Sequence, residues 1–142
     1  MKTRAEPEVE TGTGKAIFKN NRAFSSFSVD DPRKAKRFYG ETLGLDVEEN
    51  PMGLEIRIAG GSRIFVYSKP NHVPATFTIL NFPVDDVEKA VDEMTARGVR
   101  FEIYGEGDLK TNEKGIATGS RGPKIAWFKD PAGNFLSVLQ ER

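Results

Sequence analysis

The 142-residue chain is long enough for one domain with a buried core, since a globule of this size buries about 70% of its unfolded surface. Its 21 basic and 21 acidic residues are interspersed, which argues against nucleic acid or a membrane as a partner. The absence of cysteine excludes disulfides, thiolate metal sites and a cysteine nucleophile, and it fits a cytoplasmic protein. No apolar run approaches the ~20 residues that span a bilayer, and the N-terminus lacks the apolar core of a signal peptide. We expect a soluble, unprocessed protein.

The N-terminal segment differs in composition from the rest of the chain. Residues 1–14 mix charged side chains with Pro7 and a Thr-Gly-Thr-Gly stretch, which cannot bury enough apolar surface to offset the entropy of ordering. We predict a flexible tail over residues 1–21, in which residues 15–19 are compatible with a short edge strand. One folded domain should then span residues 22–142.

The first half of this domain reads as a strand, a helix and three strands. Residues 24–29 alternate as a strand, after which Asp31 is a favourable N-cap and Pro32 suits the first helical position. The helix should end near Leu43, because Gly44 can adopt the left-handed conformation of a helix stop. The strands expected after it are residues 46–48, 54–59 and 63–68, with a hairpin turn at 59–62.

The second half repeats this order 55 residues later. Residues 79–84 restate the strand, Asp86 restates the cap and Gly98 closes the helix, at an offset that indicates an internal duplication. The strands expected to follow are residues 100–104, 124–128 and 135–139. Residues 105–122 hold five glycines without strand alternation, and loops of this length are usually functional or disordered. We interpret residues 110–114 within this segment as a solvated lid or dimer arm. The sequence therefore predicts an α+β fold of two βαβββ modules, residues 22–74 and 75–142.

Three motifs in this order resemble a known superfamily. They are Val29-Asp30-Asp31-Pro32, its echo Val84-Asp85-Asp86, and the closing run Asp130-Pro131-Ala132-Gly133-Asn134-Phe135-Leu136. The pattern resembles the vicinal oxygen chelate superfamily, which includes glyoxalases, bleomycin-resistance proteins and extradiol dioxygenases. The resemblance implies that the two modules form a curved, cleft-enclosing mixed β-sheet, and that the protein is a homodimer.

The resemblance also allows a test for a metal site. Metal-using members hold one divalent ion with four His, Glu or Gln ligands, and the matching positions here are Phe24, Phe65, Ile79 and Ser137. Three of these side chains are hydrocarbon and one is a neutral hydroxyl, whereas divalent ions need carboxylate or imidazole donors. A slip of one residue gives only Ser25, Ile64, Val66, Leu80, Leu136 and Val138. We therefore predict neither a metal ion nor another cofactor.

Strand alternation and the family layout predict which side chains line the cleft. A mostly apolar pocket with a few polar groups is typical of a small-molecule site. The alternative is that the aromatic side chains fill a collapsed cleft as core. The predicted ligand-binding residues are Phe24, Ser26, Arg57, Phe65, Tyr67, Ile79, Asn81, Trp127 and Ser137.

Two functions from different classes remain open. The first is a metal-free protein that binds a small, partly apolar or aromatic compound, and the second is a lyase, isomerase or dioxygenase-type enzyme with an atypical site. A domain that only dimerises or binds another protein is a third possibility. His72, the one histidine, lies between Pro70 and Pro74 and is either an exposed linker residue or a proton carrier at the cleft rim.

Overall fold

The computed structural model describes residues 16–119 and 122–141, so most of the predicted tail lies outside the described residues. The described part of the predicted edge strand at 15–19 is instead a turn, in which the Asn21 amide donates to Phe18 O (3.1 Å). The elements are β1 (Ser25–Val29), α1 (Pro32–Arg37), the π-helix η1 (Phe38–Thr42), β2 (Asp46–Asn50), β3 (Gly53–Arg57), β4 (Arg63–Ser68), β5 (Thr78–Pro83), α2 (Val87–Ala96), β6 (Ile116–Ala117), β7 (Lys124–Lys129) and β8 (Phe135–Gln140).

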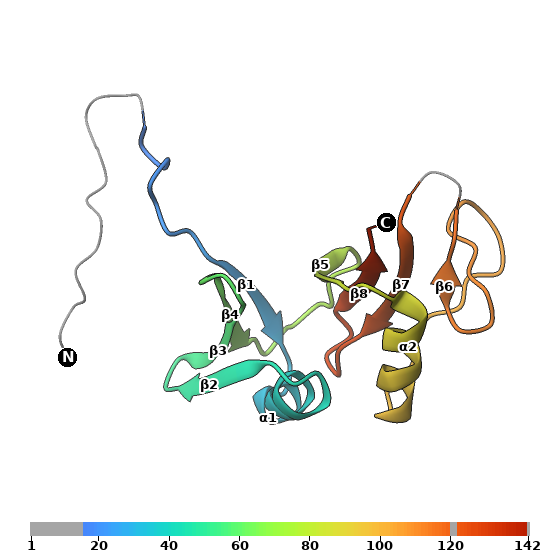
Figure 1. The fold of residues 1–142 in the computed structure, drawn as a ribbon. Coiled ribbons are helices and arrows are strands. Elements are labelled where there is room, and N and C mark those ends of the chain that lie inside the picture. Colours follow the sequence, from blue (N-terminus) through green and yellow to red (C-terminus); the bar gives the residue numbers. More distant parts are fainter. Residues whose placement is uncertain (1–15, 120–121, 142) are drawn as a thin grey trace.

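The strands form two four-stranded mixed sheets with the same internal order. The first sheet has the order β1-β4-β3-β2 and the second has the order β5-β8-β7-β6. In both sheets the first strand of the module pairs in parallel with the last, and the remaining pairs are antiparallel. This matching topology confirms the predicted α+β fold of two βαβββ modules. β1 and β5 are edge strands of separate sheets and lie nearest each other in Figure 1.

Both helices begin where the sequence predicts. The Asp31 carboxylate accepts hydrogen bonds from the Arg33 and Lys34 amides, and Asp86 accepts one from the Lys89 amide. Each helix therefore has one carboxylate that satisfies first-turn N–H groups. α1 continues into η1, in which the Leu43 amide donates to Phe38 O (2.9 Å), five residues back. Within the described ranges, no helix is long and apolar enough to cross a membrane.

The edge of the second sheet differs from the prediction. Residues 100–104 contribute only an isolated bridge between Phe101 and Phe128, and the edge strand is β6. The Tyr104 amide donates to the Thr111 hydroxyl (2.9 Å), and this hydrogen bond replaces one that a strand would make. The side chain of Asn112 likewise accepts from the Lys114 and Ile116 amides. These hydrogen bonds fold the loop back on itself just before β6.

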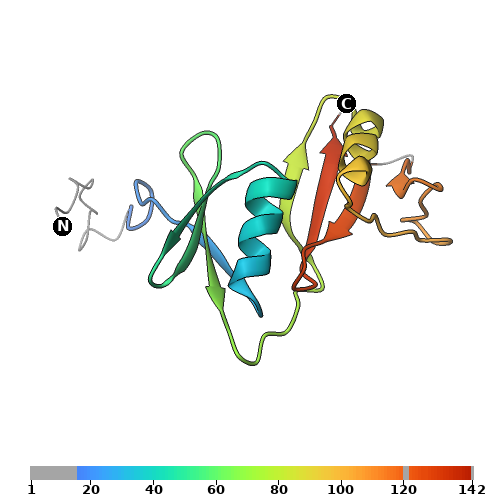
Figure 2. The same cartoon turned by 90° about the horizontal axis from the view of Figure 1, so that it is seen from below.

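One hydrophobic core extends through both modules. α1 packs on β3 and β4, α2 packs on β7 and β8, and the ring of Phe38 lies 6.3 Å from that of Phe128 in the second sheet. The buried core includes Leu54, Ile56, Val66, Val91, Phe128, Leu136 and Val138. Figure 2 shows α1 between the two sheets. The helix of the first module therefore stabilises both.

A buried carboxylate joins the modules beside this core. Asp130 is 4% exposed, and its Oδ2 accepts hydrogen bonds from the Tyr39 hydroxyl (2.7 Å) and the Asn134 side-chain amide (3.1 Å). Its Oδ1 accepts from the Ala132 and Asn134 backbone amides (2.9 and 2.8 Å). Four donors thus compensate the carboxylate for its loss of water.

Asn134 extends this network to the linker and to β1. Its side-chain nitrogen also donates to Ser28 O (3.0 Å), and its side-chain oxygen accepts from the Ala75 amide (2.9 Å). Gly133 has a φ of 89°, and a Cβ at this position would lie 3.0 Å from the Pro74 side chain. The Asp130–Asn134 turn therefore fixes β1, the linker and β8 relative to one another.

We expect the Tyr39→Phe variant to lower the free energy of unfolding by about 1–3 kcal/mol, because it removes a donor from a buried carboxylate and leaves the ring in place. Urea denaturation measures this change. Tyr67→Phe, on the half-buried face of β4, is the matched control and should change stability by less than about 0.5 kcal/mol. Equal stability of Tyr39→Phe and the unmodified protein would contradict the role assigned to this hydrogen bond.

Stability should also depend on alkaline pH through the same residue. Burial, and then the neighbouring Asp130 carboxylate, raise the pKa of Tyr39 far above its usual value of 10.0. Above about pH 10 the unfolded chain therefore loses a proton that the folded protein keeps, and stability falls as the pH rises. The Tyr39→Phe variant should show a shallower fall above pH 10 in urea denaturation. Identical slopes for the two proteins would contradict this prediction.

Candidate functional site

The face of each sheet opposite the helices, here called the open face, carries most of the predicted site residues. In the first sheet, Ser26, Phe65 and Glu55 lie side by side across β1, β4 and β3, whereas Val66 and Leu54 are buried on the other face. In the second sheet, Asn81, Ser137 and Trp127 lie side by side across β5, β8 and β7. These residues therefore share the faces that strand alternation predicts, and their role in ligand binding stays a prediction.

Three aromatic side chains form the first aromatic surface, defined here as Phe24, Phe65 and Tyr67. The rings of Phe65 and Tyr67 stack with centroids 5.9 Å apart and planes 16° apart. Phe24 is 51% exposed, and the Arg63 guanidinium carbon lies 4.1 Å from the centroid of its ring. A Cβ on Gly53 would lie 3.2 Å from the Phe65 ring, so a glycine on the neighbouring strand makes room for that ring. Phe24 is thus exposed, whereas Phe65 and Tyr67 are half-buried on the open face.

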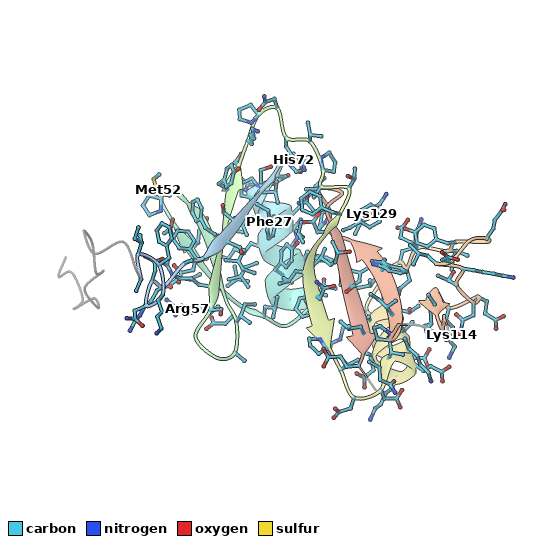
Figure 3. The ribbon with its side chains drawn as sticks, turned by 90° about the horizontal axis from the view of Figure 1, so that it is seen from above. Phe27, Met52, Arg57, His72, Lys114 and Lys129 are labelled. Atoms are coloured by element: carbon cyan, nitrogen blue, oxygen red, sulfur yellow. The ribbon has the colours of Figure 1, made fainter. Side chains whose placement is uncertain are left out.

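Arg57 also lies on the open face, but its charge is already paired. Its guanidinium group contacts the Glu48 carboxylate and lies 3.5 Å from that of Glu55. Both pairs reach solvent, so they contribute little to stability and can rearrange when a ligand binds. Figure 3 shows Arg57 on the side of the first sheet that faces away from the second.

The second aromatic surface consists of Trp127 and Tyr104. Their rings meet edge to face with centroids 5.9 Å apart, and both side chains are half-buried. Burial, and then the nearby Glu102 carboxylate, raise the pKa of Tyr104. Tyr104 is not among the site residues predicted from the sequence, in which residues 100–104 read as a strand. Its aromatic side chain next to a glycine-rich loop was the one available signal.

Polar groups lie beside Trp127 on the second sheet. The buried Ser137 hydroxyl donates a 2.5 Å hydrogen bond to the Asn81 side-chain oxygen, and Asn81 itself is exposed. Ile79 is half-buried, lies between Thr78 and Leu80 where the β5–β8 register shifts, and packs against the hydrophobic core. The bulge interrupts the period of two on which the placement of Ile79 in the cleft depended.

The glycine-rich loop adjoins the same face of the second sheet. Asp108 and Leu109 of the loop and Ile125 of β7 line a cavity of about 670 Å³. Ala117 pairs with Ile125, which lies two residues from Trp127 and therefore on the same side of the sheet. The loop thus continues the open face beyond Trp127.

One interpretation of the sequence made His72 an exposed linker residue, but the structure has it half-buried. Figure 3 shows His72 in the linker between the two modules. Its Nδ1 lies 2.7 Å from the Ser28 hydroxyl and its Nε2 lies 3.0 Å from Ala132 O. A carbonyl can only accept a hydrogen bond, so Nε2 carries a proton and, in the neutral ring, Nδ1 accepts from Ser28. No sequence motif pairs residues 28 and 72.

Comparison with known proteins identifies the family. Residues 23–138 match the Glyoxalase/Bleomycin resistance protein/Dioxygenase superfamily. The chain belongs to this superfamily. The match spans both modules and confirms the resemblance of the three sequence motifs. None of the curated proteins matches the chain.

Solved structures of the superfamily share the fold. TnmS3, an antibiotic binding protein from Streptomyces sp. CB03234, is 26% identical with a TM-score of 0.59, over 84% of this chain and 96% of that one. A glyoxalase/bleomycin resistance protein from the same organism is also 26% identical, with a TM-score of 0.54, over 83% of this chain and 100% of that one. FosX, a fosfomycin resistance protein from Listeria monocytogenes, has a TM-score of 0.64 at 14% identity, over 84% of this chain and 92% of that one, and shows the fold alone.

The metal site of other superfamily members does not fit the residues of this chain. The four matching positions hold Phe24, Phe65, Ile79 and Ser137, and the Ser137 hydroxyl is already bonded to Asn81. Within the described ranges, no three side chains of His, Cys, Asp or Glu converge as a metal centre would require. Hydrocarbon side chains cannot replace the anionic or imidazole donors of a divalent ion.

We expect the purified protein to contain no stoichiometric divalent ion, because these four side chains supply no suitable donor. Elemental analysis after dialysis measures the metal content per chain. A content near one ion per chain that a chelator removes, together with loss of ligand binding, would refute the prediction.

Proposed function

We propose that this superfamily member binds a small, flat, partly apolar or aromatic compound, without a metal ion and as a homodimer. The observation that carries the proposal is the pair of aromatic surfaces on the open faces of the two sheets. Aromatic rings that share one face of a sheet and reach solvent in part provide a surface on which a flat compound can stack. The absence of cysteine supports a cytoplasmic location.

The two surfaces have the properties of a stacking site. Phe65 and Tyr67 present nearly parallel rings, and Trp127 is held in place by Tyr104. Stacking on such rings contributes about 0.5–1.5 kcal/mol beyond the burial of apolar area. Asn81 and Ser26 are exposed beside them and can orient a ligand by hydrogen bonding. These features support binding by stacking and desolvation, for which no catalytic group is needed.

The similarity to TnmS3 supports the same class of function. That protein binds an antibiotic, and the 26% identity extends over 84% of the present chain and 96% of TnmS3. Sequestration of an antibiotic requires affinity for the compound but no chemical step. We therefore place a natural product or a similar organic compound among the ligands of this chain.

A homodimer would complete the site. The two aromatic surfaces belong to separate sheets, each of which ends in an edge strand, β1 or β5, near the middle of the molecule. Edge strands with unpaired backbone groups are commonly covered by a partner, and a second copy could bring an open face opposite each surface.

Trp127→Ala should weaken binding of acridine, a flat three-ring probe, by about 2 kcal/mol, because it removes a large stacking surface. Equilibrium dialysis measures the affinity and thermal unfolding confirms the fold. Trp127→Phe keeps an aromatic ring and should retain most of the affinity, while Phe18→Ala, at an exposed site outside both surfaces, should retain all of it. A large fall in melting temperature with unchanged affinity in the folded fraction would instead assign Trp127 to the core.

Light scattering should give a mass twice that of one 15.8 kDa chain, because a second copy covers the exposed sheet edges. The measurement should span a wide range of protein concentrations. A mass of one chain throughout that range would refute the dimer.

A further inference from the structure

We infer that Ser28 and His72 form a nucleophile–base pair that cleaves an activated ester held against the open face of the first sheet. The inference rests on the 2.7 Å contact between the Ser28 hydroxyl and His72 Nδ1, two residues that are 44 positions apart in the sequence. This activity goes beyond ligand binding and rests on its own geometry. A serine hydroxyl is a weak nucleophile, and an adjacent histidine that takes its proton makes it reactive.

The histidine is oriented for this task by a third group. His72 Nε2 lies 3.0 Å from Ala132 O, and this acceptor fixes the proton on Nε2. Nδ1 therefore presents its lone pair to Ser28. Ser28 is then the nucleophile, His72 is the base, and the Ala132 carbonyl is the acceptor that orients the base. This order of groups is typical of hydroxyl activation.

Both members of the pair are attached to the same rigid turn. Ala132 belongs to the Asp130–Asn134 turn, in which Asp130 accepts from the Ala132 amide (2.9 Å). The Asn134 side chain donates to the backbone oxygen of Ser28 itself (3.0 Å). The turn thus holds the nucleophile through its backbone and the base through its ring. Such prior positioning lowers the entropy lost when the reacting groups align.

Ser28 faces the surface on which we place the ligand. It pairs with Tyr67 across β1 and β4 and is half-buried, whereas Val29 next to it is fully buried on the core side. An acyl group bound over the first aromatic surface can therefore approach the hydroxyl. Ser25, three residues away on the same strand, is exposed and lies on the other face of the sheet. It offers a control that shares the strand and the side chain.

The proposed reaction is the hydrolysis of an aryl ester through an acyl-serine intermediate. The Ser28 oxygen attacks the carbonyl carbon of an aryl ester, and its proton moves to His72 Nδ1. The carbon–oxygen bond to the phenol then breaks, and the phenol oxygen takes that proton. Water, activated by the same nitrogen, cleaves the acyl-serine and releases a carboxylic acid. One ester and one water give one acid and one phenol, with no oxidation or reduction.

The test uses a serine-reactive fluorophosphonate and p-nitrophenyl acetate on the full chain. We expect the fluorophosphonate to add to Ser28, located by peptide mass spectrometry, and Ser28→Ala to abolish the adduct. Ser25→Ala should label at the unmodified rate, because Ser25 is exposed on the same strand and belongs to no proposed site. His72→Gln should label about 100-fold more slowly, since general-base catalysis contributes about that factor or more. The rate of p-nitrophenol release should change in the same way: Ser28→Ala should abolish it, and His72→Gln should lower it about 100-fold.

His72→Gln also separates catalysis from folding. Its side-chain amide can still donate to Ala132 O, so the linker contact survives while the base is lost. Circular dichroism should show a folded protein for every variant. Absence of an adduct on Ser28 in the unmodified protein, or labelling of His72→Gln at the unmodified rate, would overturn the inference.

Discussion

The buried carboxylate of Asp130 is the constraint on which the arrangement of the two modules depends. A carboxylate that is 4% exposed is stable only when hydrogen-bond donors replace its water, and those donors come from Tyr39, Ala132 and Asn134. Tyr39 belongs to the first module and Asn134 to the second. A change in the relative position of the modules would therefore leave a buried charge without its full set of partners.

This junction also organises the chemistry of the open faces. Asn134 fixes the end of β1 through Ser28 O, and the turn provides the acceptor for His72. The helices cover the other face of each sheet, so the duplicated fold leaves two similar open faces. The two faces carry different side chains. The first carries stacked rings with paired arginine and glutamate side chains, and the second carries Trp127 with Asn81 and Ser137.

Local signals in the sequence predicted most of the fold because the local chemistry agrees with it. Asp31 and Asp86 each precede a helix and cap it, and the alternation along β4 places Phe65 and Tyr67 on one face. The offset of 55 residues between the modules reflects the same strand order in both sheets. Helices and strands with a regular sequence period can therefore be predicted from the sequence of each module separately.

The errors and omissions arise where distant or irregular contacts decide the outcome. The strand expected at residues 100–104 is lost because the Thr111 side chain accepts from the Tyr104 amide. At Ile79 the β5–β8 register shifts, so strand alternation does not fix the face on which this side chain lies. The partners of His72 lie 44 and 60 positions away, a pairing that no local pattern indicates.

A crystal structure of the protein with bound acridine tests the central claim most directly, since that claim is that the open faces bind a flat compound. The ring system should be stacked at about 4 Å from Phe65 and Tyr67 or from Trp127. Acridine bound only at another site, such as the cavity lined by Pro32 and Gly40, would contradict the account. Burial of both aromatic surfaces against other parts of the protein, with no ligand between them, would contradict it as well.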